Sequence, residues 1–77
     1  MREIQIRKNS KNQGKRIAAA VCGYESEVFA VINGKKYNAK SIMNMPVMEQ
    51  AEIIDFLISG EDEEIVERAI MKLYGLD

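Results

Sequence analysis

The dipeptide Asn33-Gly34 is the feature that most restricts how this chain folds. It follows a β-branched and apolar run, Ser26 to Ile32, and precedes a short run from Lys35 to about Ala39. Both central residues of a two-residue type I′ turn need a positive φ, which asparagine and glycine adopt more easily than other residues. The sequence therefore predicts an antiparallel β-hairpin in the middle of the chain.

Three further segments have regular apolar patterns. Residues 3–7 alternate polar and apolar side chains, which predicts a strand covered on one face. Residues 51–59 are almost wholly apolar, which predicts a central strand buried by its neighbours, with Asp55 as an interruption. A helix is expected to start near residues 12–13, capped by Asn12 or Ser10. Its apolar residues recur at helical spacing: Ile17, Ala20, Val21 and Tyr24.

The remaining two segments are expected to be helical. Ser41 would cap a short helix that Pro46 limits to a turn or two, because an interior proline removes a hydrogen bond and clashes with the preceding turn. After Gly60, the acidic residues 61–64 suit the N-terminus of a last helix. The predicted order is β, α, β, β, short α, β, α. Residues 1–77 are thus expected to form a single α+β domain, an open-faced β-sandwich with helices on one face of a four-stranded sheet.

Composition excludes several kinds of protein and site. No apolar run is long enough for a signal peptide or a membrane span, so a cytoplasmic location without membrane contact is expected. There is no histidine and only one cysteine, Cys22, which we interpret as a buried or half-buried apolar residue. We therefore expect no metal site and no cofactor.

The charges are unevenly distributed along the chain. Residues 1–40 carry nine basic and three acidic side chains, whereas residues 41–77 carry two basic and nine acidic ones. Because both halves pack into one domain, we interpret this asymmetry as solvated charge and expect no nucleic-acid binding.

The segment from Gly34 to Met43, GKKYNAKSIM, resembles the third strand and second helix of the HPr phosphocarrier family of the sugar phosphotransferase system. Ala51-Glu52-Ile53 resembles the start of that family's fourth strand, and Gly60 resembles its final turn. The resemblance implies the HPr topology, which has the element order predicted above. It also implies protein partners, namely phosphotransferase-system enzymes, a serine kinase or a transcription regulator.

The resemblance fails at the residue that carries phosphate in that family. Family members have an active histidine, closely followed by an arginine, at the start of the first helix, where amides and the helix dipole receive a phosphoryl group. The corresponding loop, Lys8 to Arg16, has no histidine. We interpret it as a degenerate active loop whose candidate residues are Ser10, Lys15 and Arg16. A serine phosphate ester transfers its phosphoryl group far less readily than phosphohistidine, so no catalytic residue is expected.

Ser41 occupies the position at which a dedicated kinase phosphorylates many Gram-positive members of the family. The resemblance therefore implies a regulatory phosphorylation site, with the phosphate at the positive end of a helix dipole and beside Lys40. The alternative is that Ser41 is only an N-cap, whose side-chain oxygen accepts a hydrogen bond from an amide two or three residues on.

Five apolar residues after Ser41 resemble the family's protein-docking patch: Ile42, Met43, Met45, Val47 and Met48. Methionine suits such a surface because its thioether side chain adapts its shape. The alternative is that two or three of the five face the core and hold the short helix down. Met43 and Val47 are expected to be the most exposed.

These features predict a degenerate HPr-like protein that is not an enzyme and acts as a regulatory or protein-binding module. The alternative is a small structural domain, unrelated to sugar transport, that forms a homodimer through its uncovered sheet face. Phe29 and Val31 are candidates for that face, because they point opposite to their strand neighbours. A third hypothesis, phosphotransfer through another acceptor, has only Ser10 and Cys22 to use and is the least favoured.

Overall fold

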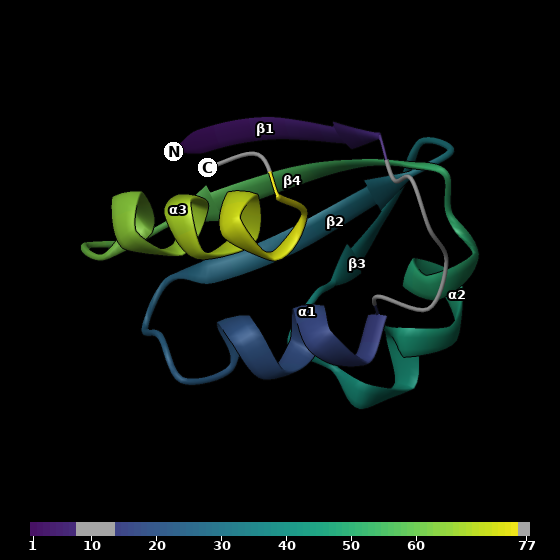
Figure 1. Cartoon of the computed structure of the whole chain (residues 1–77), viewed down its shortest axis with the longest axis horizontal. Coiled ribbons are helices and arrows are strands. Elements are labelled where there is room, and N and C mark those ends of the chain that lie inside the picture. The colour runs from purple at the N-terminus through teal and green to yellow at the C-terminus, as the bar shows by residue number, and fades with distance from the viewer. Residues whose placement is uncertain (8–13, 76–77) are drawn as a thin grey trace.

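The structure, a computed structural model, describes residues 1–7 and 14–75 and consists of a sheet with helices packed against it (Figure 1). The strands are β1 (Arg2–Arg7), β2 (Glu27–Ile32), β3 (Lys35–Asn38) and β4 (Ile53–Ser59). The helices are α1 (Gly14–Val21), α2 (Met45–Gln50) and α3 (Glu63–Leu73), and a 3₁₀ turn, η1 (Ile42–Asn44), directly precedes α2. The predicted element order and the α+β open-faced sandwich are confirmed.

The four strands form one antiparallel sheet in the order β1-β4-β2-β3. β4 is central, as predicted, because it pairs with β1 on one side and β2 on the other. β2 and β3 form the predicted hairpin. Its turn residues, Asn33 and Gly34, have φ angles of 52° and 81°, the positive values that a type I′ turn requires.

One face of the sheet lies beneath the helices and carries the hydrophobic core. Alternate residues of the strands point into it, together with the apolar stripes of α1 and α3. Each large aliphatic side chain buried in this way contributes about 1.5 to 3 kcal/mol. The largest fully buried apolar side chains are Ile6, Ile17, Val21, Val28, Met48, Ile54, Phe56, Ile58, Val66 and Ile70.

The central strand β4 differs from the sequence expectation. Buried and partly exposed residues alternate along it, so only Ile54, Phe56 and Ile58 face the core. Asp55 lies on the opposite face, where its Oδ1 accepts a 2.9 Å hydrogen bond from Nε2 of Gln5. The run predicted a strand buried by its neighbours, whereas only one face of β4 is buried. The alternation is hidden in the sequence because Ile53 and Leu57, on the open face, are apolar as well.

Hydrogen bonds connect the start of α3 to the residues that enter β2. Asp62, directly before α3, accepts hydrogen bonds from the amides of Glu25 and Ser26 at 3.0 and 2.9 Å, and from the Ser26 hydroxyl. The hydroxyl bond above all, with the two amides, holds the pKa of Asp62 below its usual value. The Asp62 side chain makes no capping bond to its own helix. Its carboxylate instead joins two segments that are far apart in the sequence.

Ion pairs hold β1 against α3. The guanidinium of Arg2 lies within 4 Å of carboxylates of Glu63, Glu64 and Glu67, and the shortest separation is 3.1 Å, to Oε1 of Glu67. The N-terminal amine lies 3.6 Å from Glu63. Surface pairs of this kind each contribute roughly 0 to 1 kcal/mol. Part of the acidic stretch after Gly60 is therefore paired within the fold.

Candidate functional site

The sequence-predicted site residues that the structure describes gather where α1 packs against η1 and α2, here called the α1–α2 surface (Figure 1). A turn built on Asn38 fixes where η1 begins. The Asn38 carbonyl accepts hydrogen bonds from the Ser41 amide at 3.2 Å and from Nδ2 of Asn44 at 3.0 Å. Its side-chain Oδ1 accepts one from the Lys40 amide at 2.9 Å. One asparagine thus orients the segment that presents Ser41.

Ser41 directly precedes η1, with φ −82° and ψ 125°, so its predicted position at the start of a short helix is confirmed. The predicted side-chain cap is wrong, because the Ser41 hydroxyl makes no capping hydrogen bond. The Asn44 amide, which a serine cap would engage, donates instead to the Ser41 backbone carbonyl at 3.1 Å. This i to i+3 bond is the one that defines a 3₁₀ turn, and it satisfies that amide without the hydroxyl.

Lys40 lies beside Ser41, and its ammonium group is engaged. Its Nζ donates a 2.6 Å hydrogen bond to the backbone carbonyl of Tyr24, in the loop that follows α1. The bond fastens the turn before η1 to the residues that follow α1.

The five predicted docking residues divide into two groups. Ile42 and Met43 are 72% and 88% exposed, whereas Met45 and Val47 pack partly against the core and Met48 is fully buried. The expectation that two or three of them face inward is confirmed, and so is the exposure of Met43. The expectation for Val47 was wrong, because it is half-buried and Ile42 is exposed in its place.

Pro46 explains that difference. It lies in the first turn of α2, where a missing amide removes no helical hydrogen bond. η1 therefore runs directly into α2, and the helical segment continues past Pro46 to Gln50, slightly longer than the expected turn or two. This continuation carries Val47 against the core and Met48 into it.

A shallow apolar hollow of about 300 Å³ lies between α1 and the start of the helical segment after Ser41. It is lined by Ala18, Ala19, Cys22, Lys40, Ile42 and Met45. Cys22 is exposed here, so its interpretation as a buried or half-buried residue was wrong. α1 ends at Val21, and the Cys22 thiol lies 3.7 Å from the Ala19 carbonyl on the surface of the helix. The hollow has the size and lining to receive one apolar side chain of a partner.

The residues of α1 that line this hollow were not predicted from the sequence. Ala18 and Ala19 line it because their small side chains keep the helix surface low beside the larger Ile42 and Met45. The run of three alanines at residues 18–20 was the available signal, since small residues in an amphipathic helix often mark a close approach or a depression.

The candidate residues of the degenerate active loop are only partly described by the structure. Ser10 and the candidate cap Asn12 lie outside the described residues. The backbone of Lys15 lies in the first turn of α1, and Arg16, the next residue, has an exposed side chain. Within residues 1–7 and 14–75, no three His, Cys, Asp or Glu side chains are grouped so as to hold a metal ion. None of the helices described is long and apolar enough to cross a membrane.

No protein-family model matches the sequence, and a search of curated proteins found no significant match. Among solved structures, the chain is similar to HPr-C-His from Thermoanaerobacter tengcongensis, with a TM-score of 0.83 and 26% identity over 96% of this chain and 91% of that one. It is also similar to a histidine-containing phosphocarrier protein of Mycoplasma, with a TM-score of 0.78 and 22% identity over 94% and 90% of the two chains. The chain therefore has the α+β open-faced sandwich fold of the HPr phosphocarrier proteins.

Proposed function

We propose that this protein is a non-catalytic relative of the HPr phosphocarriers that binds another protein through its α1–α2 surface. The observation that carries the proposal is the exposure of Ile42, which lines an apolar hollow, and of its neighbour in the sequence, Met43. Large apolar side chains grouped beside a concave apolar surface are typical of protein-binding sites, because a partner's side chain removes both from water.

The absence of histidine supports binding rather than phosphoryl transfer. The similar Mycoplasma protein is described as histidine-containing, whereas this sequence offers no imidazole nitrogen to form a labile N–P bond. Arg16, one turn before Ala19 on α1, and Lys40 on the wall of the hollow contribute positive charge. A partner that presents an apolar side chain flanked by carboxylates would complement this surface.

The proposal includes Ser41 as a regulatory phosphorylation site. The Ser41 hydroxyl makes no capping bond, so its modification removes no such bond from the fold. A phosphate would add about 1.5 to 2 negative charges at the start of η1 and beside the Lys40 ammonium. It would therefore repel a partner whose carboxylates face this surface.

Phosphoryl transfer is tested by incubating the protein with phosphoenolpyruvate and the first enzyme of the phosphotransferase system. The expected intact mass shows no added phosphate that is lost in acid. A stoichiometric acid-labile phosphate would contradict the non-catalytic assignment, and mapping it would identify the acceptor.

Binding is tested with the same first enzyme as the probe, by following methyl NMR signals of the labelled protein during a titration. Ile42 and Met43 should show the largest shifts, and Met43→Ser should weaken binding about tenfold, in keeping with the loss of one anchoring side chain. Ile65→Ser is the matched control, because Ile65 is 57% exposed on α3, which starts at the opposite end of the molecule from α2 (Figure 1). Equal losses in the two variants would contradict the α1–α2 surface as the binding site.

Regulation is tested by incubating the protein with the family's serine kinase and ATP. We expect one acid-stable phosphate that is absent in Ser41→Ala, and a phosphorylated protein that binds the first enzyme more weakly. A phosphate retained in Ser41→Ala would contradict the assignment of the site.

A further inference from the structure

The sheet face opposite the helices is open, and its two halves differ. The strand register places eight side chains on its central part in two rows: Glu3, Leu57, Phe29 and Asn38, and beside them Gln5, Asp55, Val31 and Lys36. Of these eight, the β2–β3 half contains the only basic side chain, Lys36, and the β1–β4 half contains both acidic ones, Glu3 and Asp55. Beyond the two rows, Arg7 on β1 and Glu27 on β2 stand on the same face near its ends. Phe29 and Val31 are only partly buried, as predicted for an uncovered face.

The β2–β3 half combines an aromatic side chain with a positive charge. Nζ of Lys36 lies 4.3 Å from the centroid of the Phe29 ring, which is a cation–π contact. Both side chains stand on the open face, so this half offers a bulky apolar group and a cation to anything that approaches it.

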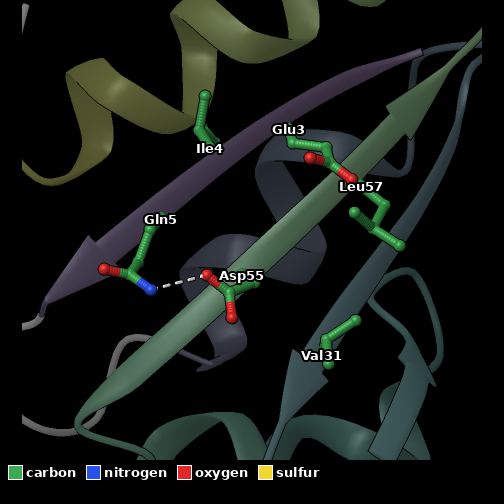
Figure 2. A pocket seen from close by; sticks show the side chains of 6 residues that line it. All are labelled: Glu3, Ile4, Gln5, Val31, Asp55 and Leu57. Atoms are coloured by element: carbon green, nitrogen blue, oxygen red, sulfur yellow. Dashed lines mark hydrogen bonds between the residues drawn. The ribbon is translucent and has the colours of Figure 1, made fainter. Parts of the chain in front are cut away.

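A shallow hollow of about 550 Å³ extends over β1 and β4 as far as Val31 of β2 (Figure 2). Its lining includes the carboxylates of Glu3 and Asp55, and Gln5 reaches toward Asp55 and donates a hydrogen bond to it. Ile4, Val31 and Leu57 form the apolar part of the lining. The hollow therefore combines an apolar floor with the negative charge of Glu3 and Asp55, which is opposite in sign to the charge of Lys36.

We propose that the open face binds a second copy of this chain, face to face, about a two-fold axis parallel to the strands. Such a rotation reverses the strand order, so the β2–β3 half of each copy faces the β1–β4 half of the other. Phe29 then lies over the partner's Leu57, because these two residues occupy the same row. Lys36 lies opposite the partner's Gln5 and next to its Asp55, and each contact occurs twice.

Charge determines the direction of the axis. A two-fold axis across the strands, through the row of Lys36, would place each strand over its own copy, with Lys36 near the other Lys36 and Asp55 near the other Asp55. The axis along the strands instead brings Lys36 to the partner's Asp55. That pairing matters because a carboxylate enclosed between two sheets is costly unless an opposite charge accompanies it.

The area of the face sets the strength of the association. Four strands about 4.8 Å apart, with four to seven residues rising about 3.3 Å each, give a face of about 360 Å² per copy. Stable interfaces bury about 800 Å² per partner, so this dimer belongs to the weak class and should form only at high protein concentration. The α1–α2 surface lies on the helix side of the sheet, so a failure of partner binding there leaves this inference unaffected.

The first test is sedimentation equilibrium of the wild-type protein from 20 µM to 2 mM at low salt, combined with isotope-filtered NMR. The average mass should rise from monomer toward dimer, and the rise should shrink severalfold at about 0.5 M NaCl because salt screens the charge pairs. Intermolecular NOEs should join the Phe29 ring to Leu57 methyls. A monomer at 2 mM, or a dimer that lacks these NOEs, overturns the proposal.

The second test reverses charges on the two halves. Lys36→Glu and Asp55→Lys should each weaken self-association at least fivefold, and an equimolar mixture of the two variants should restore it, because both contacts of the mixed dimer then pair opposite charges. Lys35→Glu is the matched control: it changes the same charge on the neighbouring residue of β3, which points to the other face. Wild-type association of Lys36→Glu, an equal loss in Lys35→Glu, or a mixture that stays monomeric overturns the proposal.

Discussion

Asp62 and Ser41 each stand directly before a helix, and the structure uses their side chains in opposite ways. The Asp62 carboxylate accepts three hydrogen bonds from Glu25 and Ser26, which precede it by 36 or 37 positions. The Ser41 hydroxyl makes no capping bond, although both residues belong to types that commonly cap helices. The residue type before a helix therefore does not reveal whether its side chain holds the fold together.

The difference follows from what surrounds each helix start. The start of α3 lies against the entry to β2, where Ser26 is 1% exposed and its polar groups need partners. The start of η1 lies at the surface, positioned by the turn at Asn38, and the helical segment is held to the core by Met48, which is fully buried. One start is fixed by its polar side chain, and the other by packing further along the helix.

The largest expected effect concerns Gly60, in the turn between β4 and α3. Its φ is 155°, and an added Cβ would lie 2.5 Å from Oγ and 2.7 Å from Cα of Ser26. Gly60→Ala should therefore lower the free energy of unfolding by about 4 kcal/mol, from steric overlap and backbone strain together. Gly23→Ala is the control, because a Cβ at Gly23 meets nothing within 4 Å. Urea unfolding measures the free energy of unfolding of both variants. Equal losses would show that Gly60 and Ser26 are not packed closely against each other.

The next effect tests whether packing holds the second helix start. Met48→Ala should destabilise the protein by about 3 kcal/mol, because it opens a cavity in the core. Met43→Ala should change the stability by less than about 0.5 kcal/mol, since Met43 is 88% exposed. Similar losses in both, measured by thermal or urea unfolding, would mean that the exposed residue also supports the fold.

A smaller effect concerns the bonds to Asp62. Ser26→Ala should cost about 1 kcal/mol, because the buried hydroxyl bond to the carboxylate is lost. Since the pKa of Asp62 is lowered in the folded protein, its contribution to stability is fully present above its ordinary pKa of 3.8 and is lost as the pH falls through the lowered folded value.

Asp62→Asn provides the matching pH experiment. The variant should lack this part of the acid dependence. The difference in the free energy of unfolding between the variant and wild type should therefore be larger at pH 7 than at pH 2. Urea unfolding at the two pH values measures it, and a difference that is the same at both would contradict the charged role of Asp62.

Local rules predicted much of this fold, and contacts between distant residues account for what they missed. The Asn33-Gly34 turn and the one-sided alternation of residues 3–7 depend on neighbours in the sequence, and the structure confirms both. The Asp62–Ser26 contact depends on packing across 36 positions. The half-burial of Val47 and the open-face position of Asp55 likewise depend on which side of each element is covered, which local periodicity in a short or apolar segment does not specify.

The smallest effect decides the role of Ser41. Because its hydroxyl makes no capping bond, Ser41→Ala should change the free energy of unfolding by less than about 0.5 kcal/mol, below the roughly 1 kcal/mol typical of a lost serine cap. Ser41→Asp should be neutral or slightly stabilising, since a carboxylate gains from the positive end of the helical segment and from the nearby Lys40. Chemical unfolding of both variants beside wild type at pH 7 measures the changes. A loss of 1 kcal/mol or more in Ser41→Ala alone would show that the hydroxyl does hold the helix start, and Ser41 would then resemble Asp62. A near-zero change would leave the hydroxyl without a structural role at this surface, as expected of a side chain whose use is to receive a phosphate.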